Sequence, residues 1–321
     1  MERKSEFEVP VAPLDAPGPS PADIAMGIGA VERDTGLSKD TLRVWERRYA
    51  FPKPGRDAFG ERVYPREQVE KLRAIKRLMD SGFRPGKIIH HGIADLNALG
   101  QRSEAGASNA CALPELDVFL NLVRTHRVEE LRRALGQEVA RGGLGQFVIS
   151  VVRPLNVAVG ELWMQGSLQI FEEHLYTESL QVVLRSAIAS VPLTPVAPRV
   201  MLTTLPNEQH GLGLLMAEAM LVLEGAHCVS LGVETPVWDI ARAAVAQKAD
   251  VVAVSFSQGY PPAQAVSGLT DLRRQLDDAV DLWVGGGSEV LGRRLPGGMQ
   301  AINDLRAIAP AVAQWRMQRG N

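Results

Sequence analysis

The chain has 321 residues, 45 % of them hydrophobic, which is enough to bury the cores of two or three domains. No apolar run reaches the roughly 18 residues of a membrane span, and the first 25 residues hold five prolines and no apolar stretch. We therefore expect a cytoplasmic protein with no membrane partner. Cys111 and Cys228 are far apart and have no CxxC partner, which argues against a disulfide framework and a cysteine-built zinc site.

The formal net charge of −2 hides an uneven distribution of charge. Residues 26–91 contain 15 Lys+Arg against 9 Asp+Glu, whereas the rest of the chain is acidic. A basic module on an acidic body predicts local contact with a polyanion.

The first third of the chain divides into three parts. Residues 1–25 are rich in proline and predict a disordered leader. Residues 26–96 form a compact set of short helical patterns. Residues 97–113 are rich in Ala, Gly and Ser, which is typical of a linker.

The periodicity changes again in the remaining two thirds. Residues 114–192 repeat apolar side chains every 3.6 residues with short connections, which predicts a four-helix bundle whose third helix is kinked at Pro154. In residues 193–321, short Val-rich runs alternate with helical patterns. This alternation predicts a doubly wound, Rossmann-like parallel sheet.

The basic module begins with a predicted helix, tight turn and helix. Gly36 ends the first helix, and Ser38 is a suitable N-cap for the second, KDTLRVWERRY. On this second helix Leu42 and Trp45 share an apolar side. Another side carries the cations Lys39, Arg43 and Arg47. Such a helix suits a DNA groove, although an ordinary solvated basic face has the same pattern.

The next residues predict a small wing that could reach phosphates beside this helix. Residues 52–64 place Pro and Gly at turn positions among Arg56, Arg62 and Tyr64, and Pro65 then opens a further helix that Gly82 ends.

The segments TLRVWERRY and RVYPREQVEKLRAIKRLMDSGF resemble the MerR family of winged helix-turn-helix regulators over about seventy residues. This resemblance implies that Arg43, Arg62 and Tyr64 hold the backbone of a double-stranded DNA operator, and that Lys39 and Asp40 lie near base edges. The complete predicted DNA-binding set is Lys39, Asp40, Arg43, Arg47, Arg56, Arg62 and Tyr64.

A second group of candidate residues begins with NEQHGLG, residues 207–213, at the end of a predicted strand. A lone loop histidine is more often a surface group than a metal ligand. Glu208, however, could accept a hydrogen bond from the ring of His210 and fix its tautomer, and Gly213 leaves room for a ligand beside the backbone.

Two later strands end in residues that should lie at the same edge of the sheet. Ser255 ends one strand, and Gly285 and Gly286 end the next. Ligands bind at the carboxyl ends of parallel strands, so these residues and His210 predict a site for a bulky cofactor with an inserted tail.

The patterns ExHxxG, SxS and GGG resemble the DxHxxG, SxL and GG patterns of cobalamin-binding domains at matching separations. Glu208 stands for the usual aspartate and Ser257 for a leucine. The resemblance implies that His210 coordinates cobalt and that the nucleotide tail of the cofactor runs toward Ser255, Gly285 and Gly286.

The bundle carries Trp163, nine residues, then Glu173 and His174. Each of these residue types alone is more often core or solvated surface. Together with the cobalamin pattern, the arrangement resembles the CarH/LitR type of MerR regulators. The resemblance implies adenosylcobalamin as cofactor, with Trp163 packed over its adenosyl group and Glu173 and His174 fixing its position. Met164 stands where light-sensing members carry a histidine that captures cobalt from above.

The expected protein is a cobalamin-dependent transcriptional repressor and not an enzyme. By the resemblance, adenosylcobalamin stabilises a homo-oligomer, a dimer or tetramer, that binds DNA until light cleaves the Co–C bond. Three alternatives remain: a sensor of cobalamin level, a cofactor-free regulator, and a mutase or methyltransferase subunit. The last is disfavoured because the chain has no pattern of a substrate barrel.

Overall fold

The computed structural model describes residues 25–80, 83–104, 114–192, 196–288, 292, 295 and 297–320. The chain forms two compact units. The first comprises residues up to Lys76 together with Pro85–Ile93, and the second comprises Arg77–Arg84 together with Ala94–Asn321. The predicted leader lies outside the described residues except for Ala25.

The first unit contains the predicted helix-turn-helix and wing. Gly36, at φ 68°, ends the first helix, and the Thr41 amide donates to the hydroxyl of Ser38 over 3.1 Å at the start of the second. Leu42 and Trp45 are buried, as their spacing predicts. Its helices are α1 (Ile28–Thr35), α2 (Lys39–Tyr49), α4 (Pro85–Ile88) and most of α3 (Arg66–Asp80), whose last residues from Arg77 on are assigned to the second unit.

A three-stranded antiparallel sheet forms the wing, in the order β1–β3–β2. Its strands are β1 (Met26–Gly27), β2 (Gly55–Arg56) and β3 (Arg62–Tyr64). The strand β1 was not predicted, because two residues are too few to show a period.

The predicted linker is wrong over its first part. Helix α5 (Ile93–Glu104) covers residues 97–104, while residues 105–113 lie outside the described part of the chain. Leu96, whose side chain is buried, belongs to this helix. Gly82, the predicted end of α3, is also outside the described residues.

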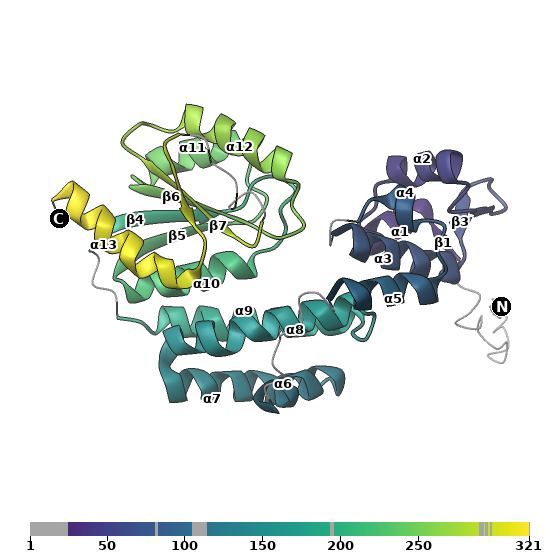
Figure 1. The fold of residues 1–321 in the computed structure, drawn as a ribbon, viewed down its shortest axis with the longest axis horizontal. Coiled ribbons are helices and arrows are strands. Elements are labelled where there is room, and N and C mark those ends of the chain that lie inside the picture. The colour runs from purple at the N-terminus through teal and green to yellow at the C-terminus, as the bar shows by residue number, and fades with distance from the viewer. Residues whose placement is uncertain are drawn as a thin grey trace, which may run out of the picture. The chain divides into compact units, whose positions relative to one another are not determined.

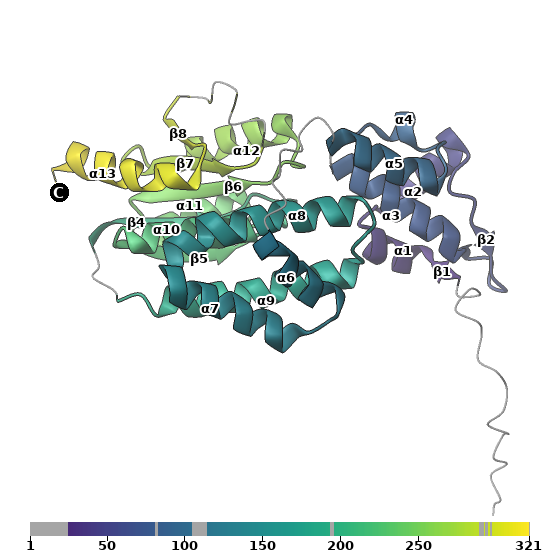
Figure 2. The ribbon, with the colours of Figure 1, turned by 60° about the horizontal axis from the view of Figure 1, so that its bottom comes forward.

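Four helical segments form the predicted bundle (Figure 2). Gly143, at φ 77°, breaks the helical backbone, so the second and third segments meet there. The third segment includes a π-helical turn just before Pro154. Proline has no amide hydrogen to donate, which explains the irregular pattern of backbone hydrogen bonds at this point. The elements are α6 (Pro114–Arg124), α7 (Val128–Phe147), η1 (Val148–Val152), α8 (Arg153–Met164) and α9 (Ile170–Ala189).

The run Val128–Trp163 is long and apolar enough, by composition alone, to cross a membrane. The side chains of Leu131, Leu135 and Phe147 in this run are buried in the bundle core. A buried core helix can have the same length and apolar composition as a membrane span.

The rest of the second unit is a parallel sheet in the order β5–β4–β6–β7–β8 with helices on both faces (Figure 1). Its strands are β4 (Val196–Thr203), β5 (Ala226–Gly232), β6 (Val251–Phe256), β7 (Asp281–Gly286) and β8 (Met299–Ile302). Its helices are α10 (Leu212–Leu223), α11 (Val237–Ala246), α12 (Pro262–Gln275) and α13 (Ile308–Arg319). The predicted alternation of Val-rich strands with helices is confirmed, and β8 is a further strand that was not predicted.

Helices α11 and α12 cover one face of the sheet, and α10 and α13 cover the other (Figure 1). The bundle packs against α10, because Leu215, Met216 and Ala219 belong to the core cluster of the bundle. Helix α10 therefore lies between the bundle and the sheet.

Candidate functional site

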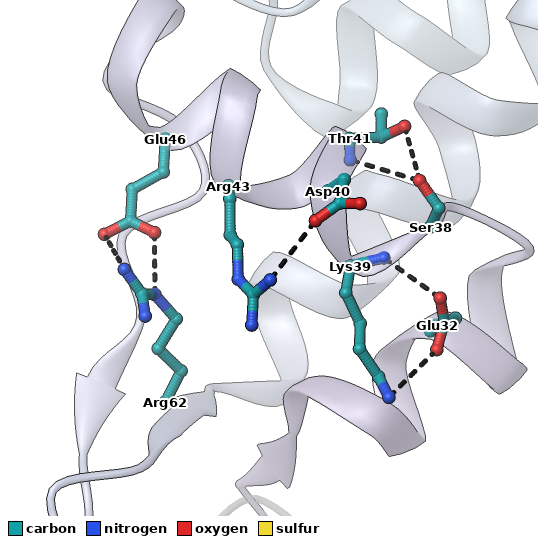
Figure 3. Close-up of polar contacts among 8 residues, drawn as sticks. All are labelled: Glu32, Ser38, Lys39, Asp40, Thr41, Arg43, Glu46 and Arg62. Carbon is teal, nitrogen blue, oxygen red and sulfur yellow. Dashed lines mark hydrogen bonds and ion pairs between the residues drawn. The ribbon is translucent and has the colours of Figure 1, made fainter.

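The predicted DNA-facing surface of the first unit carries cations that are held by carboxylates (Figure 3). Lys39 Nζ lies 3.5 Å from Glu32, and the Lys39 amide donates to the same carboxylate over 3.0 Å. On α2 itself, Arg43 Nη1 donates to Asp40 over 3.2 Å. These contacts hold the first turn of α2 and the side chains expected to approach DNA.

A third pair joins α2 to the wing. The Arg62 Nε on β3 donates to Glu46 over 2.9 Å, and a second guanidinium nitrogen lies 3.5 Å from the other carboxylate oxygen. The hydrogen bond from Arg62 to Glu46 is the main cause that raises the pKa of Arg62. The pair fixes the position of the wing relative to α2.

Tyr64 requires a correction. Its side chain is fully buried, and its hydroxyl has no hydrogen-bond partner among the described residues. Burial raises the pKa of this hydroxyl. A phosphate cannot reach the hydroxyl in this conformation, so we leave Tyr64 out of the proposed interface. Arg47 is exposed on α2, and Arg56 donates to the Gly60 carbonyl in the wing over 2.5 Å.

In the second unit, Glu208 and His210 form a short hydrogen-bonded pair after β4. The His210 Nδ1 lies 2.6 Å from Glu208 Oε1, and the His210 amide donates to the same oxygen. Glu208 is 1 % exposed, whereas the His210 side chain is 74 % exposed. The predicted role of Glu208 in orienting the imidazole is therefore present in the geometry.

Ser257 completes this network, although its sequence position suggested only a replaced leucine. Both its amide and its hydroxyl donate to the second oxygen of Glu208, over 2.7 and 2.8 Å. Burial acts to raise the pKa of Glu208, but the hydrogen bonds from His210 and Ser257 outweigh it and hold the pKa below 4.5. An ionised carboxylate only accepts hydrogen bonds, so the proton of the short contact lies on His210 Nδ1.

A cavity of about 290 Å³ opens at the carboxyl ends of β6 and β7, between the sheet and α10. The predicted residues Gly213, Ser255, Gly285 and Gly286 all line it. Its apolar wall includes Trp283. The structure thus brings the predicted tail-binding residues to one cavity.

Glycine is required where this cavity meets the backbone. Gly286 has φ 114°, and a Cβ there would lie 2.0 Å from the Phe256 carbonyl oxygen. A Cβ on Gly213 would lie 3.0 Å from the Ser255 hydroxyl. Glycine at these two positions lets β7 and α10 approach β6 closely beside the cavity.

The bundle contributes a charged side chain to the same cavity. Arg153 on α8 lines it and donates to Asp304 over 2.8 Å, in the loop before α13. A hydrogen bond from the Arg306 amide, followed by the charge of Arg153, lowers the pKa of Asp304. The bundle and the sheet are therefore linked by an ion pair at the cavity.

The other predicted bundle residues lie where α8 ends and α9 begins. Trp163 is half-buried against the bundle core. Glu173 accepts from the Thr177 hydroxyl over 2.6 Å and lies 3.3 Å from His174, which is 73 % exposed. None of Trp163, Glu173 and His174 is among the described residues that line the cavity. The Met164 side chain lies outside the described part of the chain.

Comparisons with known families match both halves of the chain. A model of the MerR HTH family regulatory proteins matches residues 26–91, and a model of the B12 binding domain matches residues 198–296. The chain therefore joins a DNA-binding helix-turn-helix module to a cobalamin-binding domain.

Two repressors from Myxococcus xanthus match most of the chain. The HTH-type transcriptional repressor CarH is 30 % identical over 258 residues, which cover 78 % of this chain and 85 % of CarH. The HTH-type transcriptional repressor CarA is 29 % identical over 252 residues, which cover 78 % and 83 %. The monomethylamine corrinoid protein of Methanosarcina barkeri superposes with a TM-score of 0.47 at 15 % identity, over 63 % of this chain and 98 % of its own.

CarH and CarA are named as regulators and not as enzymes, in agreement with the prediction for this chain. The order of the modules, the matched lengths and the identity to CarH establish the relationship. The chain belongs to the CarH-type family of cobalamin-binding MerR transcriptional regulators.

Proposed function

We propose that the protein is a cytoplasmic repressor that binds adenosylcobalamin, oligomerises with it and releases DNA on illumination. The names of CarH and CarA support repression. The resemblance of Trp163, Glu173 and His174 to the CarH/LitR pattern supports the adenosyl form and the response to light.

The observation that carries the cofactor assignment is the cavity lined by Gly213, Ser255, Gly285 and Gly286. At Gly213 and Gly286 the neighbouring protein atoms leave little room for a Cβ. Since the residues that line the cavity include ones from α10, β6 and β7, the cavity can take the nucleotide tail of a cobalamin beside the sheet.

His210 is proposed as the axial ligand to cobalt. Glu208 accepts a hydrogen bond from the protonated Nδ1 of His210, so Nε2 carries the lone pair that a metal ligand needs. Ser257 holds Glu208 in turn through two hydrogen bonds. When bound, adenosylcobalamin would supply a cobalt–carbon bond that green or blue light cleaves.

The bundle is proposed to cover the upper face of the cofactor. Trp163 would pack over the adenosyl group, and Glu173 and His174 would hold its position and assist contacts between copies. In the resulting dimer or tetramer, several DNA-binding modules act together and raise the effective affinity for the operator.

Met164 favours a second candidate function, a sensor of cobalamin level. A thioether is a softer and poorer ligand for Co(III) than the imidazole at this position in light-sensing members. A chain without that imidazole would not form the stable photoproduct in which two histidines bind cobalt. Its response would then depend on the presence of the cofactor.

The test compares the protein loaded with adenosylcobalamin in the dark and after illumination. Absorption spectra, gel filtration and DNA binding are measured for wild type and His210→Ala. Light-driven loss of both the oligomer and DNA affinity in wild type supports light sensing. Oligomer formation that depends on the cofactor but not on light supports level sensing, and a colourless wild-type protein would refute cobalamin binding.

A further inference from the structure

We propose that Glu32, Asp40 and Glu46 compete with DNA phosphates for the cations of the DNA-facing surface and so weaken binding to DNA of arbitrary sequence. The inference rests on the proposed assignment of α2 and the wing to the DNA-facing surface. It is independent of the cofactor and of light.

The competing carboxylates already pair with cations that DNA phosphates would contact. Lys39 is paired with Glu32 and Arg43 with Asp40, so two of the predicted contacts on α2 already have an anionic partner (Figure 3). Arg47, which no described carboxylate pairs, lies one turn beyond Arg43 on the same helix. Two of the three predicted cations on α2 are thus already paired with carboxylates of the same chain.

The pair of Glu46 with Arg62 is the least exposed of the three. Its side chains are 31 % and 30 % exposed, against 37 % and 47 % for Glu32 and Lys39 and 89 % and 50 % for Asp40 and Arg43. Two guanidinium nitrogens face the two carboxylate oxygens. Less solvent and two contacts make this pair the harder one for a phosphate to displace.

The effect on DNA binding follows from electrostatics. A phosphate that takes Arg62 must separate it from Glu46 and leaves that carboxylate without its partner beside a polyanion. Binding to arbitrary sequence depends almost wholly on phosphate contacts, whereas operator binding adds contacts to bases. The carboxylates therefore lower the sequence-independent affinity and reduce the amount of repressor held on non-operator DNA.

The test uses the full-length protein and a random-sequence duplex of about 30 base pairs, longer than the footprint of a helix-turn-helix dimer. Affinity is measured by fluorescence anisotropy over a range of salt concentrations for Glu32→Gln, Asp40→Asn, Glu46→Gln and the triple variant. Each single variant should bind about two- to fivefold tighter than wild type, with the largest increase for Glu46→Gln. The slope of log K against log salt should steepen by up to about 0.9 for each additional phosphate that the protein neutralises.

Glu70→Gln is the matched control for net charge. Glu70 pairs with Arg66 over 2.8 Å on α3, so this variant removes the same charge from an ion pair that lies on neither α2 nor the wing. Its affinity should stay within twofold of wild type. Glu46→Asp keeps the charge but shortens the side chain, and it should not bind tighter than wild type. Tighter binding by this variant would point to a loosened wing instead of lost competition.

Arg47→Ala distinguishes two reasons for a negative result: that the carboxylates do not compete with phosphates, or that α2 and the wing do not face DNA. If Arg47→Ala weakens binding while the three carboxylate variants bind no tighter than Glu70→Gln, competition by the carboxylates is overturned. If Arg47→Ala and Arg62→Ala both leave the affinity unchanged, α2 and the wing do not face DNA and the inference fails with that assignment.

Discussion

The buried carboxylate of Glu208 accepts a hydrogen bond from Nδ1 of His210 over 2.6 Å, so a group that is 1 % exposed sets the orientation of an imidazole that is largely in solvent. Ser257 holds Glu208 from the other side through its amide and hydroxyl. These hydrogen bonds fix the orientation of the largely exposed ring. This arrangement suits a residue that must meet a bulky group in one defined direction.

Glu208→Gln tests this relationship directly. The amide is nearly isosteric but uncharged, so it should hold His210 and its tautomer less firmly. Loss of such an orienting partner weakens metal affinity by about 10- to 100-fold. We expect that loss in titrations of adenosylcobalamin followed by absorption. Ser257→Ala, which leaves the charge in place, should lose less, and equal affinities of wild type and Glu208→Gln would contradict the role of the carboxylate.

The same residue predicts a pH dependence of stability. Since hydrogen bonds hold the pKa of Glu208 below 4.5, the ionised form stabilises the fold. That contribution is complete above the unfolded pKa and is lost as the pH falls through the lower folded pKa. Between about pH 6 and pH 3, the free energy of unfolding should fall more steeply for wild type than for Glu208→Gln. Denaturant unfolding of both proteins checks this, and parallel curves would exclude it.

Gly285 and Gly286 should respond differently to the same added methyl group. A Cβ on Gly286 would lie 2.0 Å from a backbone oxygen at φ 114°, so Gly286→Ala should destabilise the sheet domain by at least about 3 kcal/mol. A Cβ on Gly285 would make an ordinary 3.5 Å contact with the Ile302 carbonyl oxygen. Gly285→Ala should therefore fold normally but bind cobalamin more weakly, because the methyl group narrows the cavity. Thermal unfolding and cobalamin titration distinguish the two variants, and normal stability of Gly286→Ala would contradict the argument.

Sequence patterns predicted the features of this protein that depend on local spacing. Ser38 before KDTLRVWERRY indicated the start of α2, and Ser255, Gly285 and Gly286 indicated strand ends that meet at one edge of a parallel sheet. Both predictions follow from rules that hold along the chain or across a parallel sheet. The fold class was therefore accessible without coordinates.

Contacts between distant residues were not accessible in this way. Ser257 lies 49 residues after Glu208, and its role depends on the path of the loop after β6. Tyr64 was placed at the DNA surface by its position in the wing, but the packing of the first unit buries it. The pairing of Glu46 with Arg62, 16 residues apart, likewise depends on how the wing turns back toward α2. The paths of loops and the packing of side chains decide these three features, and neither produces a periodic pattern in the sequence.

Tyr64→Phe is the test of the corrected DNA surface. The hydroxyl is buried without a partner among the described residues, so its removal leaves no group unsatisfied and should keep or raise stability by up to about 1 kcal/mol. Because a phosphate cannot reach it, the affinity for DNA should stay within about twofold of wild type, whereas Arg62→Ala should weaken binding and reduce its salt dependence. Thermal unfolding and anisotropy measurements on the two variants check both parts. A tenfold loss of DNA affinity in a stably folded Tyr64→Phe protein would show that the wing opens on DNA and exposes the hydroxyl to the backbone.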